Sequence, residues 1–189
     1  VALKIFDDEL IEKYGDATQL ARIDRELELV GKRHPNMVGI LGGGFDDITK
    51  NHFIVMEYLK GPNLKECLSK VPAENIPELI QQLASAAKFL ETLGLVHRDI
   101  KPENIFLTKN EDGEVVAKIV DFGLAKFYEP ANEGGDAARL TKEGALFGTP
   151  AYMSPEQAAG DPEAVDIRAD IYALGAIGYE LLAGRTPLE

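Results

Sequence analysis

The sequence is poor in the residues that stabilise small secreted or metal-bound domains. Of its 189 residues, one is a cysteine, Cys67, and none is a tryptophan. A single cysteine cannot form an intrachain disulfide or supply the thiolates of a structural zinc site. The longest apolar stretch, residues 171–183, is interrupted by glycines and Glu180, and it falls short of the about 20 residues that span a membrane. We therefore expect no membrane segment in this chain, and a location in the cytoplasm or in the cytoplasmic part of a membrane-anchored protein.

Positive charge is also scarce. Lys and Arg number 20 against 32 Asp and Glu, which gives a formal net charge of −12. Nucleic-acid binding depends on basic surfaces that neutralise phosphates, so this balance argues against a DNA or RNA partner and is compatible with basic peptide substrates. Hydrophobic residues make up 45% of the chain, a proportion typical of folded proteins rather than disordered ones.

The first 59 residues have the pattern of a small sheet with one helix. Three segments rich in apolar residues, at 1–6, 37–41 and 52–58, predict strands. Residues 16–33 predict a helix, because apolar side chains recur there every three or four positions. The members of this apolar face are Leu20, Ile23, Leu27 and Val30.

The tract Gly42-Gly43-Gly44 is not a convincing phosphate loop. It lacks both the lysine and the Gly-x-Gly-x-x-Gly order of such loops. A bend or a bulge in a strand is the expectation.

The remainder is mainly helical. Residues 76–94 and 166–183 predict two long helices, and the second is so apolar that it should be central. Between them, strands at 105–108 and 115–120 flank a hairpin turn at 110–113.

The most informative motif lies at residues 97–104, which read His-Arg-Asp-Ile-Lys-Pro-Glu-Asn. Asp121-Phe122-Gly123 begins 17 residues after Asn104, a gap that fits one hairpin. Together they supply an acid that can take a proton from a hydroxyl, a lysine, and oxygen ligands for metal-bound phosphates, which are the requirements of phosphoryl transfer. With these motifs the chain resembles the eukaryotic-type protein kinase family.

Two further stretches refine this resemblance. Residues 148–156, Gly-Thr-Pro-Ala-Tyr-Met-Ser-Pro-Glu, resemble the end of the activation segment of serine/threonine kinases, with Ser154 in place of the usual alanine. The segments 155–158 and 170–175 resemble the bacterial branch of the family.

The resemblance implies an α+β, bilobal fold over residues 1–189. A β-rich N-lobe would occupy 1–59, with a hinge at 57–61, and a helical C-lobe would occupy 62–189. It also implies a domain truncated at both ends, because the family's glycine-rich loop and its final helices have no counterpart in the sequence.

The catalytic residues implied by the resemblance come from both lobes. Asp99 would accept the proton of the substrate hydroxyl, Lys101 would steady the transferring phosphoryl group, and Thr149 would help to seat the substrate. Lys4 would contact the α- and β-phosphates and would be held by Glu26. Because the spacing in this helix is about one residue shorter than usual, Glu28 stays open as the alternative.

The same resemblance implies ATP and Mg²⁺ as cofactors. Asn104 and Asp121 would hold the metal, since hard oxygen ligands suit it. Met56 would shape the back of an adenine pocket. The backbone of Glu57 and Leu59 would bind the adenine edge, and Ala2 and Phe106 would enclose its ring.

Further residues are assigned supporting or regulatory roles. His97 is expected to be a packed structural residue against Phe122 rather than a general base, and Asp170 to brace the catalytic loop. Arg98 and Lys126 are candidates to bind a phosphate on Thr141, whose charge would order the segment around it.

The function that the resemblance implies is a serine/threonine protein kinase that acts on a protein substrate, with a dimer of two kinases as a route to autophosphorylation. A non-catalytic, kinase-like interaction module or an inactive fragment is the alternative. Because Lys4, Asp99, Asn104 and Asp121 are all present, descent from an active enzyme is favoured. Thr149 argues against a small-molecule kinase.

Overall fold

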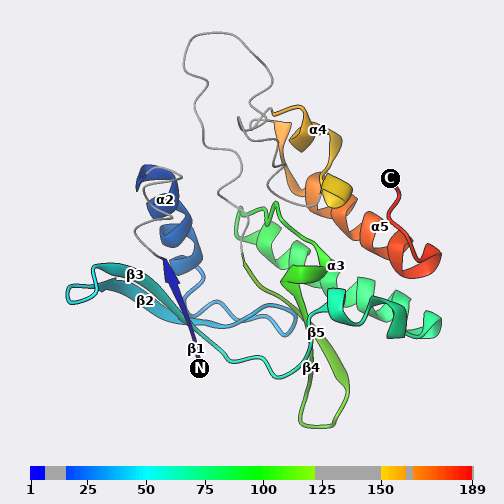
Figure 1. Cartoon of the computed structure of the whole chain (residues 1–189), viewed down its shortest axis with the longest axis horizontal. Coiled ribbons are helices and arrows are strands. Elements are labelled where there is room, and N and C mark those ends of the chain that lie inside the picture. Colours follow the sequence, from blue (N-terminus) through cyan, green and yellow to red (C-terminus); the bar gives the residue numbers. More distant parts are fainter. Residues whose placement is uncertain (7–15, 122–149, 161–163, 189) are drawn as a thin grey trace.

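The structure is a computed structural model that describes residues 1–6, 16–121, 150–160 and 164–188, and every structural statement below concerns these parts of the chain. Its first part is a three-stranded antiparallel sheet in the order β1-β3-β2. The strands are β1 (Ala2–Phe6), β2 (Ile40–Asp46) and β3 (Asn51–Met56), and helix α2 (Asp16–Leu27) packs beside them (Figure 1).

The strand predicted at residues 37–41 starts later than expected and runs through the glycine tract 42–44. β2 begins at Ile40, and its register against β3 shifts between Ile40 and Gly42, just before the glycine tract. The three glycines themselves pair in regular register with β3, so the irregularity lies one position earlier than expected. Gly43 then passes very close to β3. A Cβ atom at this position would lie 2.5 Å from the carbonyl oxygen of Phe53 and 2.7 Å from Leu27 Cδ2. The strand can therefore follow this path because it has no side chain there.

Helix α2 also ends earlier than the apolar pattern suggested. After Leu27 the chain tightens into turns in which Leu29 N–H bonds to Glu26 O and Val30 N–H bonds to Leu27 O. Gly31 follows with a φ of +77°, a conformation that stops a helix. The tighter turns bring Leu29 into the core and leave Val30 42% exposed, so the prediction that Val30 belongs to the helix face was wrong.

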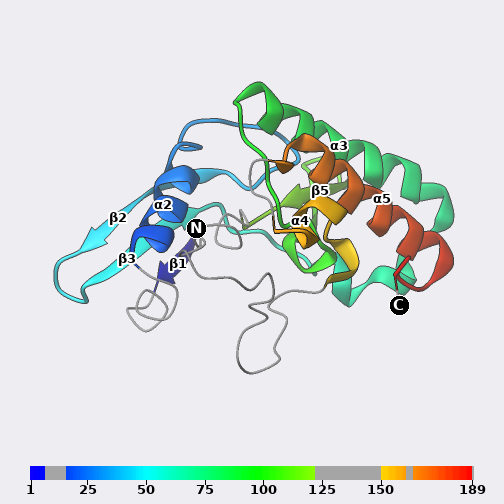
Figure 2. The same ribbon diagram turned by 90° about the horizontal axis from the view of Figure 1, so that it is seen from above.

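The second part is built on two helices and a hairpin. Helices α3 (Ile76–Thr92) and α5 (Ile167–Ala183) lie side by side in both ribbon views (Figures 1 and 2). The hairpin of β4 (Ile105–Lys109) and β5 (Val115–Ile119) packs on α3. Side chains of this core are fully or almost fully buried, including Leu83, Leu90, Ala173 and Ile177. Helix α5 buries one face against α3 but leaves Ile171, Tyr179 and Leu182 of its other face exposed, so the prediction that this helix is central was wrong.

Short helical turns fill the connections. Residues 64–70 form two 3₁₀ turns, η1 (Leu64–Glu66) and η2 (Leu68–Lys70), and Asn63 caps the first by accepting the N–H of Glu66. The other short elements are η3 (Ala73–Asn75), η4 (Pro102–Asn104), η6 (Pro150–Tyr152) and α4 (Pro155–Ala158). None of the helices in the described parts is long and apolar enough to cross a membrane.

A short extended segment ties the two parts together. Val38 N–H donates to Ile119 O at 2.9 Å, and Ile119 N–H donates to Asn36 O at 3.0 Å. The buried amide of Asn36 adds bonds to Ala117 O and to Gln82 Oε1, each 3.0 Å long. Because β5 leads directly to Asp121, this connection fixes the sheet of the first part relative to the residues that follow β5.

Candidate active site

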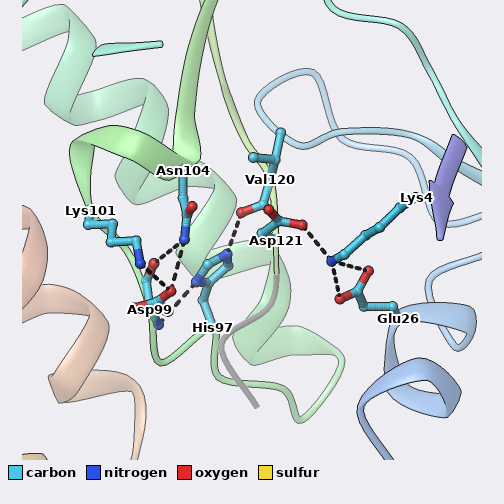
Figure 3. Close-up of polar contacts among 8 residues, drawn as sticks. All are labelled: Lys4, Glu26, His97, Asp99, Lys101, Asn104, Val120 and Asp121. Atoms are coloured by element: carbon cyan, nitrogen blue, oxygen red, sulfur yellow. Dashed lines mark hydrogen bonds and ion pairs between the residues drawn. The ribbon is translucent and has the colours of Figure 1, made fainter. Parts of the chain in front are cut away.

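The loop between α3 and β4 brings an acid, a lysine and an amide together. Lys101 Nζ lies 2.9 Å from Asp99 Oδ2, and Asn104 Nδ2 donates to the same oxygen at 3.0 Å and to Asp99 O at 2.9 Å (Figure 3). Asn104 is 7% exposed, and its backbone carbonyl accepts the N–H of Val120. The orientation of the Asp99 carboxylate is therefore set by two side chains from its own loop.

Helix α5 holds the start of this loop through a buried carboxylate. Asp170 accepts the N–H of His97 at 2.8 Å on one oxygen and the N–H of Arg98 at 2.8 Å on the other. Arg98 has a φ of +68°, which an L-residue rarely adopts without being held. Burial raises the pKa of Asp170, while the electrostatic interaction with His97 and the two backbone N–H groups oppose that rise. The bracing contact predicted for this acid is thus present as two hydrogen bonds.

His97 is completely buried between the loop and the end of β5. Its Nε2 lies 3.2 Å from Val120 O, and its Nδ1 lies 3.3 Å from the N–H of Asp99. These partners assign the proton to Nε2, because a carbonyl only accepts and an N–H only donates. Burial lowers the pKa of His97 against the opposing charges of Asp170 and Asp99, so the ring is neutral near pH 7. It packs and orients the loop, as expected. Its predicted neighbour Phe122 lies outside the described residues.

On the opposite side of the site, Lys4 lies between two carboxylates. Its Nζ is 2.9 Å from Glu26 Oε1 and 2.5 Å from Asp121 Oδ1 (Figure 3). Glu26 is 1% exposed, whereas Glu28, the alternative partner, is exposed beyond the end of α2. The structure therefore brings Glu26 rather than Glu28 to Lys4, and it adds Asp121 as a second partner.

The donor set suits a hard divalent cation. Asp121 offers a carboxylate, and Asn104 offers its side-chain carbonyl oxygen, because both of its bonds to Asp99 use Nδ2. Oxygen ligands of this kind are those that Mg²⁺ prefers, with phosphates and water completing its shell. Among the described residues there is no cluster of three or more His, Cys, Asp or Glu side chains that could hold a metal.

The residues predicted to surround adenine lie where β3 leaves the sheet. Ala2 and Met56 are direct partners across β1 and β3. The N–H of Glu57 donates to Gly39 O at 2.9 Å, so this backbone donor is already bonded within the protein. Leu59 and Phe106 are half-buried members of the adjoining core.

Two side-chain contacts in the site region were not predicted from the sequence. The side chain of Glu57 accepts the N–H of Gly39 at 2.8 Å and pairs with Lys118 Nζ at 2.7 Å, which joins the edge of the sheet to β5. Gln157 of α4 donates to Arg98 O at 2.8 Å. Both side chains act across long sequence separations, which spacing along the chain cannot indicate. Thr149, Lys126 and Thr141 lie outside the described residues.

The structure combines two features. Its sheet carries a lysine in an ion pair, and its helical part carries a loop with an acid, a lysine and an amide. Together these features define the class of two-lobed folds that transfer phosphoryl groups. A comparison with family models matches residues 1–189 to the protein kinase domain, and the chain belongs to this family. The predicted α+β, bilobal fold is thereby confirmed.

Individual relatives give the same result. The chain is 36% identical to the serine/threonine-protein kinase pkn2 of Myxococcus xanthus, over 100% of this chain and 22% of that protein. It is 32% identical to the serine/threonine-protein kinase PknB of Mycobacterium leprae, over 99% of this chain and 29% of that protein. Both relatives are bacterial, in agreement with the predicted branch, and the chain spans less than a third of either.

A solved structure shares the fold. The crystal structure of Rad53 1–466 in complex with AMP-PNP is similar to this chain with a TM-score of 0.67 and 25% sequence identity. The similarity covers 99% of this chain and 42% of that one.

Proposed function

We propose that this chain carries the catalytic centre of a serine/threonine protein kinase, which transfers the γ-phosphoryl group of ATP to a hydroxyl of a protein. The observation that carries the proposal is the position of Asp99, whose carboxylate is held by Lys101 and Asn104 within one loop. A carboxylate held in this way can act as the base that accepts the proton of an attacking hydroxyl. Lys101, bound to the same carboxylate, supplies a positive charge beside the acceptor.

Nucleotide binding is assigned to both lobes. Lys4, oriented by Glu26, is the group that would contact the α- and β-phosphates. In the structure Lys4 is also paired with Asp121, and this contact would be replaced by the contact with the phosphates when Asp121 binds the metal. Asn104 and Asp121 would hold Mg²⁺, which neutralises phosphate charge when bound. The carbonyl of Glu57, the backbone of Leu59, and the side chains of Ala2, Met56 and Phe106 would bind adenine. The complex of Rad53 with AMP-PNP supports a nucleotide in this fold.

A protein substrate follows from the family and from the relatives' names. The net charge of −12 disfavours nucleic acid as the partner. Glu103, in the same loop as Asp99, has its Oε2 buried with no hydrogen-bond partner among the described residues. Glu103 also carries a negative charge, which would suit a basic side chain of the substrate. The cytoplasm, where ATP is available, is the location that we propose.

Regulation by phosphorylation belongs to the same proposal. A phosphate on Thr141 would bind Arg98 and Lys126, and two kinase molecules in a dimer would phosphorylate each other. Replacing Thr141 with alanine should then lower both activity and incorporated phosphate. An unchanged rate together with unchanged phosphorylation would remove this part of the proposal.

The test of the main proposal is nucleotide-dependent phosphorylation by the full-length protein. ATP and Mg²⁺ should give phosphoserine or phosphothreonine on the kinase itself and on a basic protein substrate. Binding of ATP without any transfer would instead identify a non-catalytic, kinase-like module.

A further inference from the structure

Gln157 links the segment at 150–160 to the loop that carries Asp99. This side chain is 6% exposed. Its Nε2 donates to Arg98 O at 2.8 Å, and its Oε1 accepts the N–H of Ser154 at 3.1 Å. The orientation of the amide is unambiguous, because the Arg98 carbonyl can only accept and the Ser154 N–H can only donate.

The contact acts on a backbone that is held in an unusual conformation. The N–H of Arg98 is bound by Asp170 Oδ1 at 2.8 Å, and its carbonyl is bound by Gln157, so Arg98 is held from both sides. Arg98 has a φ of +68°. Residues in this region of φ and ψ persist only where their surroundings fix them.

The held carbonyl belongs to the peptide group that joins Arg98 to Asp99. The other end of that peptide, the Asp99 N–H, faces His97 Nδ1 at 3.3 Å. The plane of this peptide sets the direction in which the Asp99 side chain leaves the backbone. An error of a fraction of an ångström in the position of a general base is costly for proton transfer.

We propose that Gln157 is a positioning residue for Asp99, and that its amide holds the Arg98–Asp99 peptide in the orientation that aims the carboxylate at the substrate hydroxyl. This inference rests on the proposed kinase function. Gln157 would then have two roles at once, because the same amide caps α4 and holds the catalytic loop. Displacement of Ser154 or α4 would then be transmitted to Asp99.

Replacement of Gln157 with glutamate separates these tasks. A glutamate has the same shape and can still accept the N–H of Ser154, because capping boxes use either residue. An ionised carboxylate cannot donate to Arg98 O. A protonated one can, through its O–H group. The expected effect of Gln157→Glu therefore depends on pH.

In the full-length protein, Gln157→Glu should lower kcat about tenfold at pH 8 and change KM for ATP less than twofold. The ratio of its kcat to that of the wild type should rise as the pH is lowered to 6. Other charged groups around this side chain are Arg98, Asp99, Lys101 and Asp170. Dividing the kcat of the variant by that of the wild type at each pH corrects for the titration of these groups. Gln81→Glu, the same change at an exposed position of α3, is the matched control and should leave kcat and its pH profile unchanged.

A second measurement does not depend on activity. Amide hydrogen exchange in residues 97–101 should be faster in Gln157→Glu than in the wild type, with exchange in α3 unchanged. A wild-type protein that transfers no phosphate would contradict the proposed function, and the exchange result would still decide whether Gln157 holds the loop. An unchanged kcat with unchanged exchange overturns the inference. A loss of kcat that does not depend on pH and is accompanied by a matching fall in Tm also overturns the inference, because it would show that Gln157 has a purely structural role.

Discussion

The ammonium group of Lys4 in β1 and the carboxylate of Glu26 in α2 form an ion pair 2.9 Å long, across 22 positions of sequence. Glu26 is almost completely buried, so its charge is compensated within the protein and not by water. The pair links the helix to the sheet and fixes the direction of the Lys4 side chain. Without Glu26, the remaining carboxylate at Lys4 is Asp121, a candidate metal ligand.

Glu26→Gln is therefore expected to weaken nucleotide use. The substituted amide can still accept a hydrogen bond but cannot neutralise Lys4, which would stay on Asp121. KM for ATP should rise about tenfold, corresponding to about 1.4 kcal/mol, in a steady-state assay of the full-length protein. Glu28→Gln makes the same change at an exposed position only two residues away and should leave KM within twofold. Equal effects of the two substitutions would contradict the role of the ion pair.

The glycine tract of β2 provides a stability test with an internal control. A Cβ at Gly43 would meet Phe53 O and Leu27 Cδ2 at 2.5 and 2.7 Å, whereas one at Gly42 would have nothing within 4 Å. Gly43→Ala should lower the free energy of unfolding by about 1–3 kcal/mol through overpacking. Gly42→Ala should leave it unchanged or raise it by about 0.5 kcal/mol. Chemical denaturation measures both, and similar values for the two variants would show that β2 does not approach β3 as described.

His97 predicts a dependence of stability on pH. Burial lowers its pKa in the folded protein from the ordinary value of 6.5. Below pH 6.5 the unfolded chain therefore binds a proton that the folded protein does not, and the free energy of unfolding falls on acidification. Asp170 acts in the opposite direction, because its raised pKa makes the folded state bind a proton first.

The effect of His97 is isolated by comparison with His97→Phe. Between pH 7.5 and 5.5 the wild type should lose about 1 kcal/mol more stability than this variant, measured by denaturation at each pH. The half-buried His34 is present in both proteins, so its contribution largely cancels in the difference. Identical pH dependence of the two proteins would mean that His97 is not held neutral.

Most of the fold was accessible from the sequence because its signals are local. The strands at 105–108 and 115–120 were placed within a residue, since short apolar segments flank a turn whose Gly113 adopts a φ of +82°. The helix at 166–183 was placed equally well, since Asp166 caps its start and Gly184 ends it. Errors arose where tertiary packing decides, as in the tight turns after Leu27.

In the site, too, the features within one loop were predicted from the sequence and the contacts between distant segments were not. The motif at 97–104 identified the acid, lysine and amide, which lie within a single loop. The choice between Glu26 and Glu28 needed the structure, because the end of α2 decides which carboxylate reaches Lys4. The contact of Gln157 with Arg98 was not predicted, because Arg98 lies 59 positions earlier and no local pattern marks the contact.

The most direct test of the proposed function is the rate of phosphoryl transfer by Asp99→Asn in the full-length protein, followed with ATP labelled in its γ-phosphate. Asparagine keeps the shape of the side chain but cannot accept the substrate proton as a carboxylate does. Asp112→Asn, the same change in the exposed turn between β4 and β5, is the control. We expect Asp99→Asn to lower kcat at least about 100-fold with KM for ATP nearly unchanged, while Asp112→Asn behaves as the wild type. A wild-type rate in Asp99→Asn would contradict the assignment of Asp99 as the catalytic base.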